Sequence, residues 1–250
     1  MACRRFRVGV LCLLFFFFAP MLKATEVRVA VAANFLATLK VLAPLYTQQS
    51  GNSLVVSAGS SGKLYAQIVN GAPYDVLLSA DQHFPQKLIQ TGRALVETRF
   101  VYATGVLVLW SAEKRALDGT HLTSENVKRI ALANPAIAPY GTAAKQVLNK
   151  MGLWKELEKK VVRGESVGQA FQFVASGNAQ LGFIALSQVL NTNNRFNRQY
   201  YWQVPMDLYP PLVQEAVLLE YGKHNAAARH FLEFLNSPAA REVISKYGYR

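Results

Sequence analysis

The stretch VVSAGSSGKL, residues 55–64, joins two kinds of local structure. The run LVVSA at residues 54–58 is rich in β-branched side chains and predicts a strand, whereas Leu64 and Ile68 lie one helical turn apart. Between them, GSSG at residues 59–62 predicts a tight turn. A strand that passes through a small-residue turn into a helix is the repeating unit of α/β folds.

This turn does not have the spacing of two known catalytic loops. A P-loop needs a glycine five residues before Gly62 and Lys63 and a Ser or Thr after them, but Ser57 and Leu64 occupy those positions. A G-x-S-x-G elbow would need glycine at Lys63. Two interpretations remain: an ordinary N-capped turn, or a helix start whose unpaired N–H groups hold an anion.

Apolar β runs alternate with helical stretches along the rest of the chain. They are found at residues 27–32, 54–58, 74–79, 105–110, 128–133, 160–163, 181–185 and 216–219. This alternation predicts an α/β fold with mostly parallel sheets. An uncharged strand at residues 105–110 and a proline-rich return before residue 217 suggest two crossings between lobes. The expected division is 25–105 with 217–250 as lobe 1, and 106–216 as lobe 2.

The first 24 residues have the layout of a secretory signal peptide. Three arginines within residues 1–7 precede an apolar run at 8–18, and small residues around Ala24 suggest cleavage after it. The apolar run is short for a membrane span, although an uncleaved anchor is the alternative. We therefore expect an exported protein, in the periplasm.

Removal of this leader changes the charge and the cysteine content. It takes four of the 27 Lys and Arg residues and none of the 15 acidic ones, so the net charge falls from +12 to +8. Both cysteines, Cys3 and Cys12, lie in the leader, so disulfides and thiol chemistry are not expected in the mature chain. The basic residues are scattered rather than clustered, which argues against nucleic acid as a partner.

Four predicted helix starts follow strands and carry small or hydrogen-bonding residues. They are at Asn34, which is a favourable N-cap, at the GSSG turn, at NPAIAPYGT (residues 134–142) and at ESVGQ (residues 165–169). In the last of these, Ser166 and Gln169 form a capping box. Open α/β sheets bind ligands at the carboxyl ends of strands, where these starts lie. Such a site has many donors and few acceptors, which suits a fully deprotonated oxyanion.

An enzyme is the alternative from a different class, with Ser60 or Ser61 as nucleophile. The chain has four histidines, and none lies in a recognisable Ser–His–Asp context. A third alternative is a binding protein for sulfate, phosphate or an organic anion.

Six motifs occur in an order that resembles the periplasmic molybdate-binding proteins, the substrate-binding components of molybdate ABC transporters. They are VAVAANF, SAGSSGKLYAQI, GAPYDVLLSADQ, NPAIAPYGTAA, ESVGQAF and LGFIALSQV, and the similarity covers nearly the whole mature chain. The resemblance implies a two-lobed, type II periplasmic-binding-protein fold without enzymatic activity. It also implies a monomer without a cofactor, whose partners are an inner-membrane permease and its ATPase. The implied ligand is molybdate or tungstate, held by hydrogen bonds with no protein ligand to the molybdenum.

The same resemblance implies which residues hold the anion. Asn34 and the Ala33 backbone would contact it from the first helix start, and Ser61, with Ser60 beside it, from the GSSG turn. Tyr140 and the backbone N–H of Val167 would close on the other side. Many relatives have serine at the position of Asn34 and tyrosine at that of Ala185. This chain resembles the variant in which Asn34 and Tyr140 supply the side-chain groups.

Overall fold

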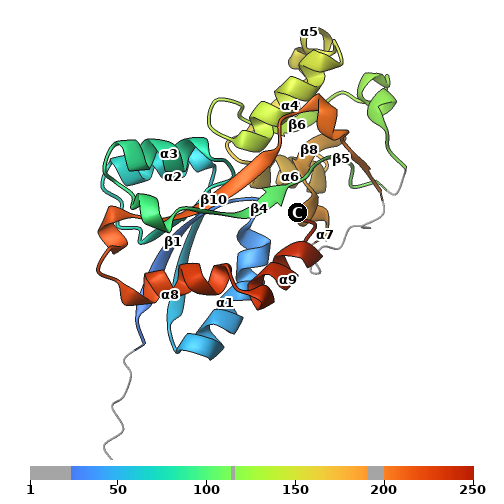
Figure 1. Cartoon of the computed structure of the whole chain (residues 1–250). Helices are drawn as coiled ribbons and strands as arrows, with labels where there is room; N and C mark the ends of the chain where they lie inside the picture. The colour runs from blue at the N-terminus through green and yellow to red at the C-terminus, as the bar shows by residue number, and fades with distance from the viewer. Residues whose placement is uncertain (1–23, 114–115, 191–199) are drawn as a thin grey trace, which may run out of the picture.

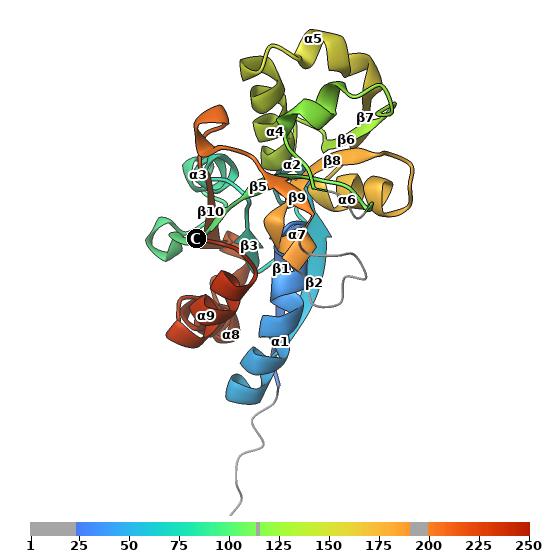
Figure 2. The same ribbon diagram turned by 90° about the vertical axis from the view of Figure 1, so that its right-hand side faces the viewer.

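The computed structural model describes residues 24–113, 116–190 and 200–250. The predicted leader, 1–24, lies outside the described residues except for Ala24. The described chain forms two lobes, each built on one five-stranded sheet with helices packed against it (Figures 1 and 2). This is the predicted two-lobed α/β architecture of periplasmic binding proteins.

The first sheet contains the strand predicted from the opening stretch. Its order is β2 (Ser53–Gly59), β1 (Glu26–Ala32), β3 (Val76–Leu78), β10 (Leu212–Leu218) and β4 (Phe100–Gly105). Strands β2, β1 and β3 are parallel, and β10 runs antiparallel to both of its neighbours. The lobe's helices are α1 (Leu36–Ser50), α2 (Ser61–Val69), α3 (His83–Gln90), α8 (Ala226–Leu235) and α9 (Pro238–Lys246).

The second sheet repeats this plan. Its order is β7 (Val161–Gly164), β6 (Ile130–Ala133), β8 (Leu181–Ala185), β5 (Leu107–Trp110) and β9 (Tyr201–Gln203). Here β5 is the antiparallel strand, paired with β8 and β9. Its helices are α4 (Pro139–Lys150), α5 (Trp154–Leu157), α6 (Val167–Ala175) and α7 (Leu186–Leu190). Five 3₁₀ turns complete the described elements: Val96–Thr98, Gly119–Thr123, Glu158–Lys160, Met206–Leu208 and Glu220–Gly222.

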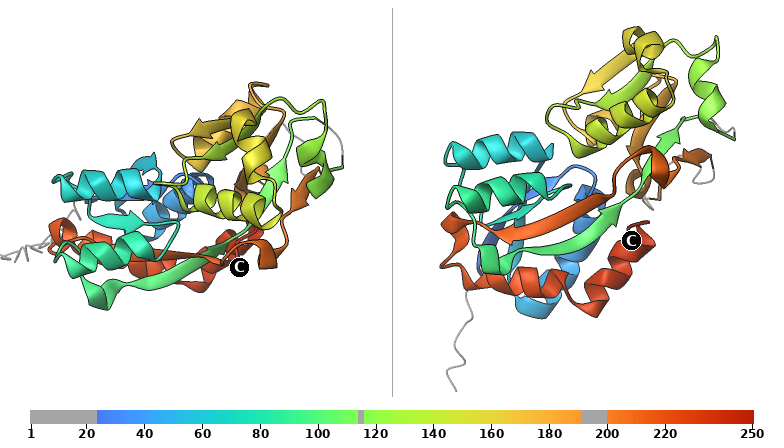
Figure 3. Two further views of the ribbon diagram at one scale, coloured as in Figure 1. Left: turned by 90° about the horizontal axis from the view of Figure 1, so that it is seen from above. Right: turned by 45° about the horizontal axis from the view of Figure 1, so that its top comes forward.

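In each sheet, the antiparallel strand is the first strand that forms after the chain crosses into that lobe. It is β5 in the second lobe, and β10 when the chain returns to the first lobe. Strands β4 and β5 are separated only by Val106, and β10 lies beside β4 where the chain returns (Figure 3). The predicted return at residue 217 falls inside β10, because β10 pairs with β4 from Leu212 onward. Pro210 and Pro211 directly precede this strand. The return of the chain to the first lobe therefore lies earlier in the sequence than the apolar pattern suggested.

Apolar packing is separate in the two lobes. In the second lobe, Trp110 and Phe183 are fully buried in one core. The first sheet buries Phe35 and Phe231 on one face, and Leu77 and Leu88 on the other. The segments that lie between the lobes are therefore attached to two separately packed cores. Within the described residues, the structure has no helix of sufficient length and apolar character to cross a membrane.

Candidate anion-binding site

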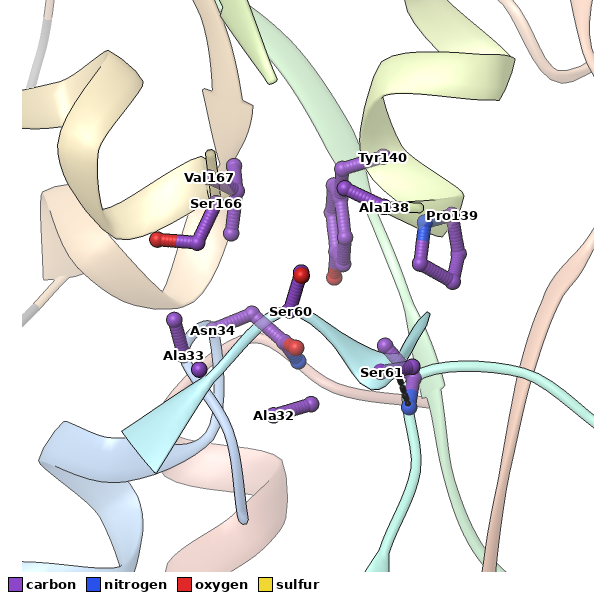
Figure 4. A pocket seen from close by; sticks show the side chains of 12 residues that line it. Ala32, Ala33, Asn34, Ser60, Ser61, Ala138, Pro139, Tyr140, Ser166 and Val167 are labelled. Carbon is purple, nitrogen blue, oxygen red and sulfur yellow. Dashed lines mark hydrogen bonds between the residues drawn. The ribbon is translucent and has the colours of Figure 1, made fainter. Parts of the chain in front are cut away.

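A small cavity lies between the two lobes (Figure 4). All six residues predicted from the sequence lie along its wall: Ala33, Asn34, Ser60, Ser61, Tyr140 and Val167. The structure adds Ala32, Gly59, Ala80, Ala138, Pro139 and Ser166. Ala185 is fully buried and does not line this cavity. The lining residues include no charged side chain.

The predicted helix starts meet at this cavity. Ser61 is the first residue of α2, Val167 is the first of α6, and Tyr140 is the second of α4. The N–H groups of these three residues and of Asn34 have no acceptor in the part of the chain that the structure describes. The first N–H groups of a helix have no partner within the helix and carry partial positive charge. The cavity wall is therefore a ring of free donors.

The first helix begins later than the sequence suggested. Helix α1 starts at Leu36, and its N-cap is Phe35, which makes no side-chain cap bond. The prediction of Asn34 as the N-cap is wrong, because its amide bonds instead to Gln214 and Tyr249. The Ala33 N–H donates to the Gly59 carbonyl at 2.9 Å, so the free backbone donor here belongs to Asn34.

Side-chain caps hold two of the other helix starts. Ser60 accepts the Lys63 N–H at 3.4 Å, and Ser166 accepts the Gln169 N–H at 3.3 Å. In the predicted capping box, the Gln169 side-chain oxygen accepts a hydrogen bond from the N–H of Glu165, one residue before the cap. Because the caps satisfy the third N–H of each helix, the first N–H remains free for a ligand.

Two hydroxyl groups at the cavity already accept a hydrogen bond from the protein. The Ser61 hydroxyl accepts the Ala80 N–H at 2.9 Å, and the Tyr140 hydroxyl accepts from the Gln214 amide at 3.4 Å. Burial raises the pKa of Tyr140 well above its ordinary value, so the phenol stays protonated. Each hydroxyl thus keeps its proton available as a donor to the cavity.

Asn34 carries an acceptor that no group satisfies. Its side-chain nitrogen donates to the Gln214 carbonyl oxygen at 2.8 Å and to the Tyr249 hydroxyl at 3.1 Å. Its Oδ1 is buried and has no hydrogen-bond partner within the described residues. Sequence reasoning missed Gln214 and Tyr249, although a glutamine inside the apolar strand LVQEAVL was a visible signal.

The nearby lysines do not reach into the cavity. Lys63 Nζ lies 2.8 Å from Glu165 Oε2 across the lobes, and Lys145 Nζ lies over the ring of Trp154. No group of three His, Cys, Asp or Glu side chains suited to a metal ion is found in the described ranges. The cavity can therefore hold a small anion by neutral donors, with helix dipoles as the source of positive potential.

Comparison with known proteins assigns this arrangement to a family. The family of bacterial extracellular solute-binding proteins matches residues 27–250. The molybdate-binding protein ModA of Azotobacter vinelandii is 47% identical over 91% of this chain and 90% of its own length. ModA of Rhodobacter capsulatus is 45% identical over 90% of this chain and 88% of its own.

A solved structure agrees with the sequence matches. The periplasmic molybdate-binding protein of Azotobacter vinelandii has a TM-score of 0.86 and 44% identity, and the match covers 90% of this chain and 99% of that one. These relatives are transport proteins and not enzymes, so the hydrolase alternative is set aside. The chain belongs to the bacterial extracellular solute-binding proteins and, among them, to the ModA family.

Proposed function

We propose that this protein captures molybdate, and also tungstate, between its two lobes and delivers it to an ABC permease. The observation that carries this is the ring of free N–H groups at Asn34, Ser61, Tyr140 and Val167 around a cavity without charged side chains. A tetrahedral dianion without protons offers only acceptors, which matches such a ring. The two closely similar ModA proteins are named for molybdate binding.

Neutral donors can hold a dianion in this place because the cavity is small and lined by residues of both lobes. The local dielectric there is far below that of water, and the donors are fixed by helix geometry before the anion arrives. Sulfate has the same charge and shape but is smaller. Discrimination would then rest on the fit of the anion to the cavity.

The proposal extends to cell location and partners. Residues 1–24 would direct export and be removed, and the mature protein would act in the periplasm as a monomer without a cofactor. Its partners would be the inner-membrane permease and the associated ATPase, and nucleic acid would not be among them. Mass measurement of the protein from the periplasmic fraction would test the cleavage after Ala24.

Titration calorimetry with molybdate, tungstate and sulfate tests the ligand. We expect tight binding of the first two anions and much weaker binding of sulfate. Ser61→Ala and Tyr140→Phe should each cost one hydrogen bond to a charged acceptor, about 1.5–3 kcal/mol. Tyr209→Phe is a matched control, since this buried hydroxyl bonds to the Leu107 N–H and does not line the cavity. Sulfate binding as tight as molybdate would overturn the assignment.

One observation favours a second candidate, an oxyanion that keeps a proton. Asn34 Oδ1 is an unpaired acceptor, and hydrogen phosphate or hydrogen arsenate would need one. Glu165, which precedes the lining residue Ser166, does not line the cavity itself and is bound to Lys63. Phosphate and arsenate therefore belong in the same titrations, and binding of either one tighter than molybdate would favour this candidate.

A further inference from the structure

Gln214 lies behind the cavity and connects residues of both lobes. It is fully buried in β10 and does not line the cavity itself. Its Oε1 accepts from Asn34 at 2.8 Å and from the Tyr102 hydroxyl at 3.0 Å, and its Nε2 donates to the Tyr140 hydroxyl at 3.4 Å. Asn34 belongs to the first lobe and Tyr140 to the second. A single amide therefore bonds to the side chains of two residues that line the cavity.

Two backbone features make this contact possible. The pairing of β10 with β4 shifts register between Gln214 and Glu215, where Tyr102 of β4 has no partner opposite it. Bulges re-aim side chains and occur beside functional sites. On β4, a Cβ at Gly105 would lie 2.2 Å from the Tyr140 hydroxyl and 2.6 Å from Gln214 Nε2. No side chain larger than that of glycine fits there while Tyr140 and Gln214 remain in contact.

The direction of the Gln214 amide determines which groups it can hold. In the structure Oε1 accepts from Asn34 and Tyr102, and Nε2 faces Tyr140. That donation occupies a lone pair of the Tyr140 oxygen and leaves its proton for the cavity. If the amide were reversed, Tyr140 would donate to Gln214 and its proton would be lost to a ligand. The amide direction thus decides which groups an anion meets.

We propose that Gln214 is the positioning residue of the anion site, which keeps the Tyr140 hydroxyl a donor to the cavity and fixes Asn34, whose free donor is its backbone N–H. The identity of the anion in this proposal rests on the proposed function, whereas the contacts of Gln214 with Asn34 and Tyr140 do not depend on it. Gln214 touches no ligand. It acts by keeping Tyr140 a donor and by holding the Asn34 amide in place.

The first test compares two variants with a matched control. Gln214→Met has a similar length but makes neither bond, and molybdate should bind about tenfold more weakly. Tyr102→Phe removes a hydrogen bond to the same Oε1 without touching the cavity, and it should change the affinity by less than about threefold. Equal effects of these two variants would overturn the proposal in favour of a merely structural role. Thermal unfolding without anion separates lost stability from lost binding.

The second test uses Gln214→Glu, because the protonation state of the new carboxyl can be changed with pH. A protonated carboxyl can donate to Tyr140 and accept from Asn34 as the amide does, whereas an ionised one only accepts and adds negative charge. Burial should raise the pKa of this carboxyl, so affinity should fall steeply as the pH rises from about 6 to 8. Wild-type affinity should stay flat over the same range. Among the described residues, the ionisable groups around position 214 include Tyr102, Tyr140, Tyr209, Tyr249, Asp81 and the Glu215–Arg99 pair.

These groups explain why the wild type should be flat. Burial raises the pKa of Tyr102, Tyr140 and Tyr249, so these three side chains stay neutral. Burial also raises the pKa of the Asp81 carboxyl above its ordinary acidic value. Asp81 is present in both proteins, so the affinity ratio between wild type and variant reports position 214. A variant whose affinity does not respond to pH would contradict the proposal.

A third measurement needs no ligand. In isotope-labelled wild-type protein without anion, nuclear Overhauser contacts should join the Gln214 side-chain amide protons to the Tyr140 ring. Their absence would overturn the positioning role whether or not molybdate binds. Failure of the wild type to bind molybdate would instead overturn the proposed function and leave the contact to be judged by this spectrum.

Discussion

Two bridges join the lobes from neighbouring residues of helix α2, and their chemistry differs. The Gly62 N–H donates to the Ile137 carbonyl at 2.9 Å, and a Cβ at Gly62 would lie 2.9 Å from the same oxygen. Lys63 forms an ion pair with Glu165 at 2.8 Å, and the two side chains are 51% and 67% exposed. One bridge is a backbone contact without spare room, and the other is a pair of long side chains in solvent.

The difference shows which kind of contact controls closure around an anion. Ile137 precedes Tyr140 and Glu165 precedes Val167, so each bridge is attached to a segment that carries a proposed donor. Backbone atoms at contact distance cannot move apart without moving those donors. The exposed ion pair is screened by water and can rearrange. We therefore expect affinity to depend strongly on the first bridge and weakly on the second.

Gly62→Ala should break the backbone bridge and have the largest effect. The added methyl group would meet three Ile137 atoms within 3.0 Å, two of them backbone, so the lobes must shift apart. Overpacking of this kind costs about 1–3 kcal/mol, which predicts roughly 5- to 150-fold weaker molybdate binding by calorimetry. Since alanine favours helices over glycine, the thermal stability of the anion-free protein should not fall.

Gly59→Ala is the matched control for this variant. It lies in the same turn and, unlike Gly62, lines the cavity, but its Cβ would meet only Leu64, at an ordinary 3.5 Å. It should bind molybdate nearly as well as the wild type. Equal losses in both variants would mean that flexibility of the turn, rather than contact with Ile137, controls the affinity.

The sequence predicts the strand-to-helix starts well because local rules determine them. The GSSG turn begins α2 where the Leu64 and Ile68 spacing indicates, and Ser60 and Ser166 act as side-chain caps. The contacts between lobes could not be predicted in this way. The Gly62–Ile137 bond joins residues 75 positions apart, and Lys63–Glu165 joins residues 102 apart. No periodicity or turn signal reports which loops meet after the chain has crossed twice.

The same limit explains the two errors in the predicted boundaries and caps. Asn34 has the right residue type for an N-cap, but tertiary bonds to Gln214 and Tyr249 use its amide instead. Strand β10 starts at Leu212 because it pairs with β4, and its polar members Gln214 and Glu215 hid it from an apolar pattern. Both polar residues are buried because each has partners from other segments.

Gly168→Ala should have an intermediate effect on the same closure. Its Cβ would lie 3.3 Å from the Cβ of Ala33 and 3.5 Å from the Ser166 hydroxyl, which is tight but not a backbone clash. A shift of a few tenths of an ångström would relieve it, at a cost below about 1 kcal/mol. Molybdate affinity should fall by less than about fivefold in calorimetry. A loss as large as that of Gly62→Ala would erase the distinction between backbone and side-chain contacts.

Loss of the charged bridge should have the smallest effect, and it should depend on salt. Glu165→Gln and Lys63→Met should each weaken molybdate binding by less than about threefold at low ionic strength, with no difference at high salt. The exposed pair Lys246–Glu242, inside helix α9, is the control, because its removal leaves the lobes unaffected. Double substitution of Lys63 and Glu165 should match either single one.

The pH dependence of this bridge has a definite sign. Hydrogen bonding to Lys63 and its positive charge lower the pKa of Glu165 in the closed protein. A lowered pKa means that the pair favours closure above the ordinary carboxyl pKa and loses this effect as the pH falls through the lowered value. The affinity ratio between wild type and Glu165→Gln should therefore approach one in acid. A ratio that grows on acidification would show that Glu165 repels the anion more than it holds Lys63, and the charged bridge would then oppose binding.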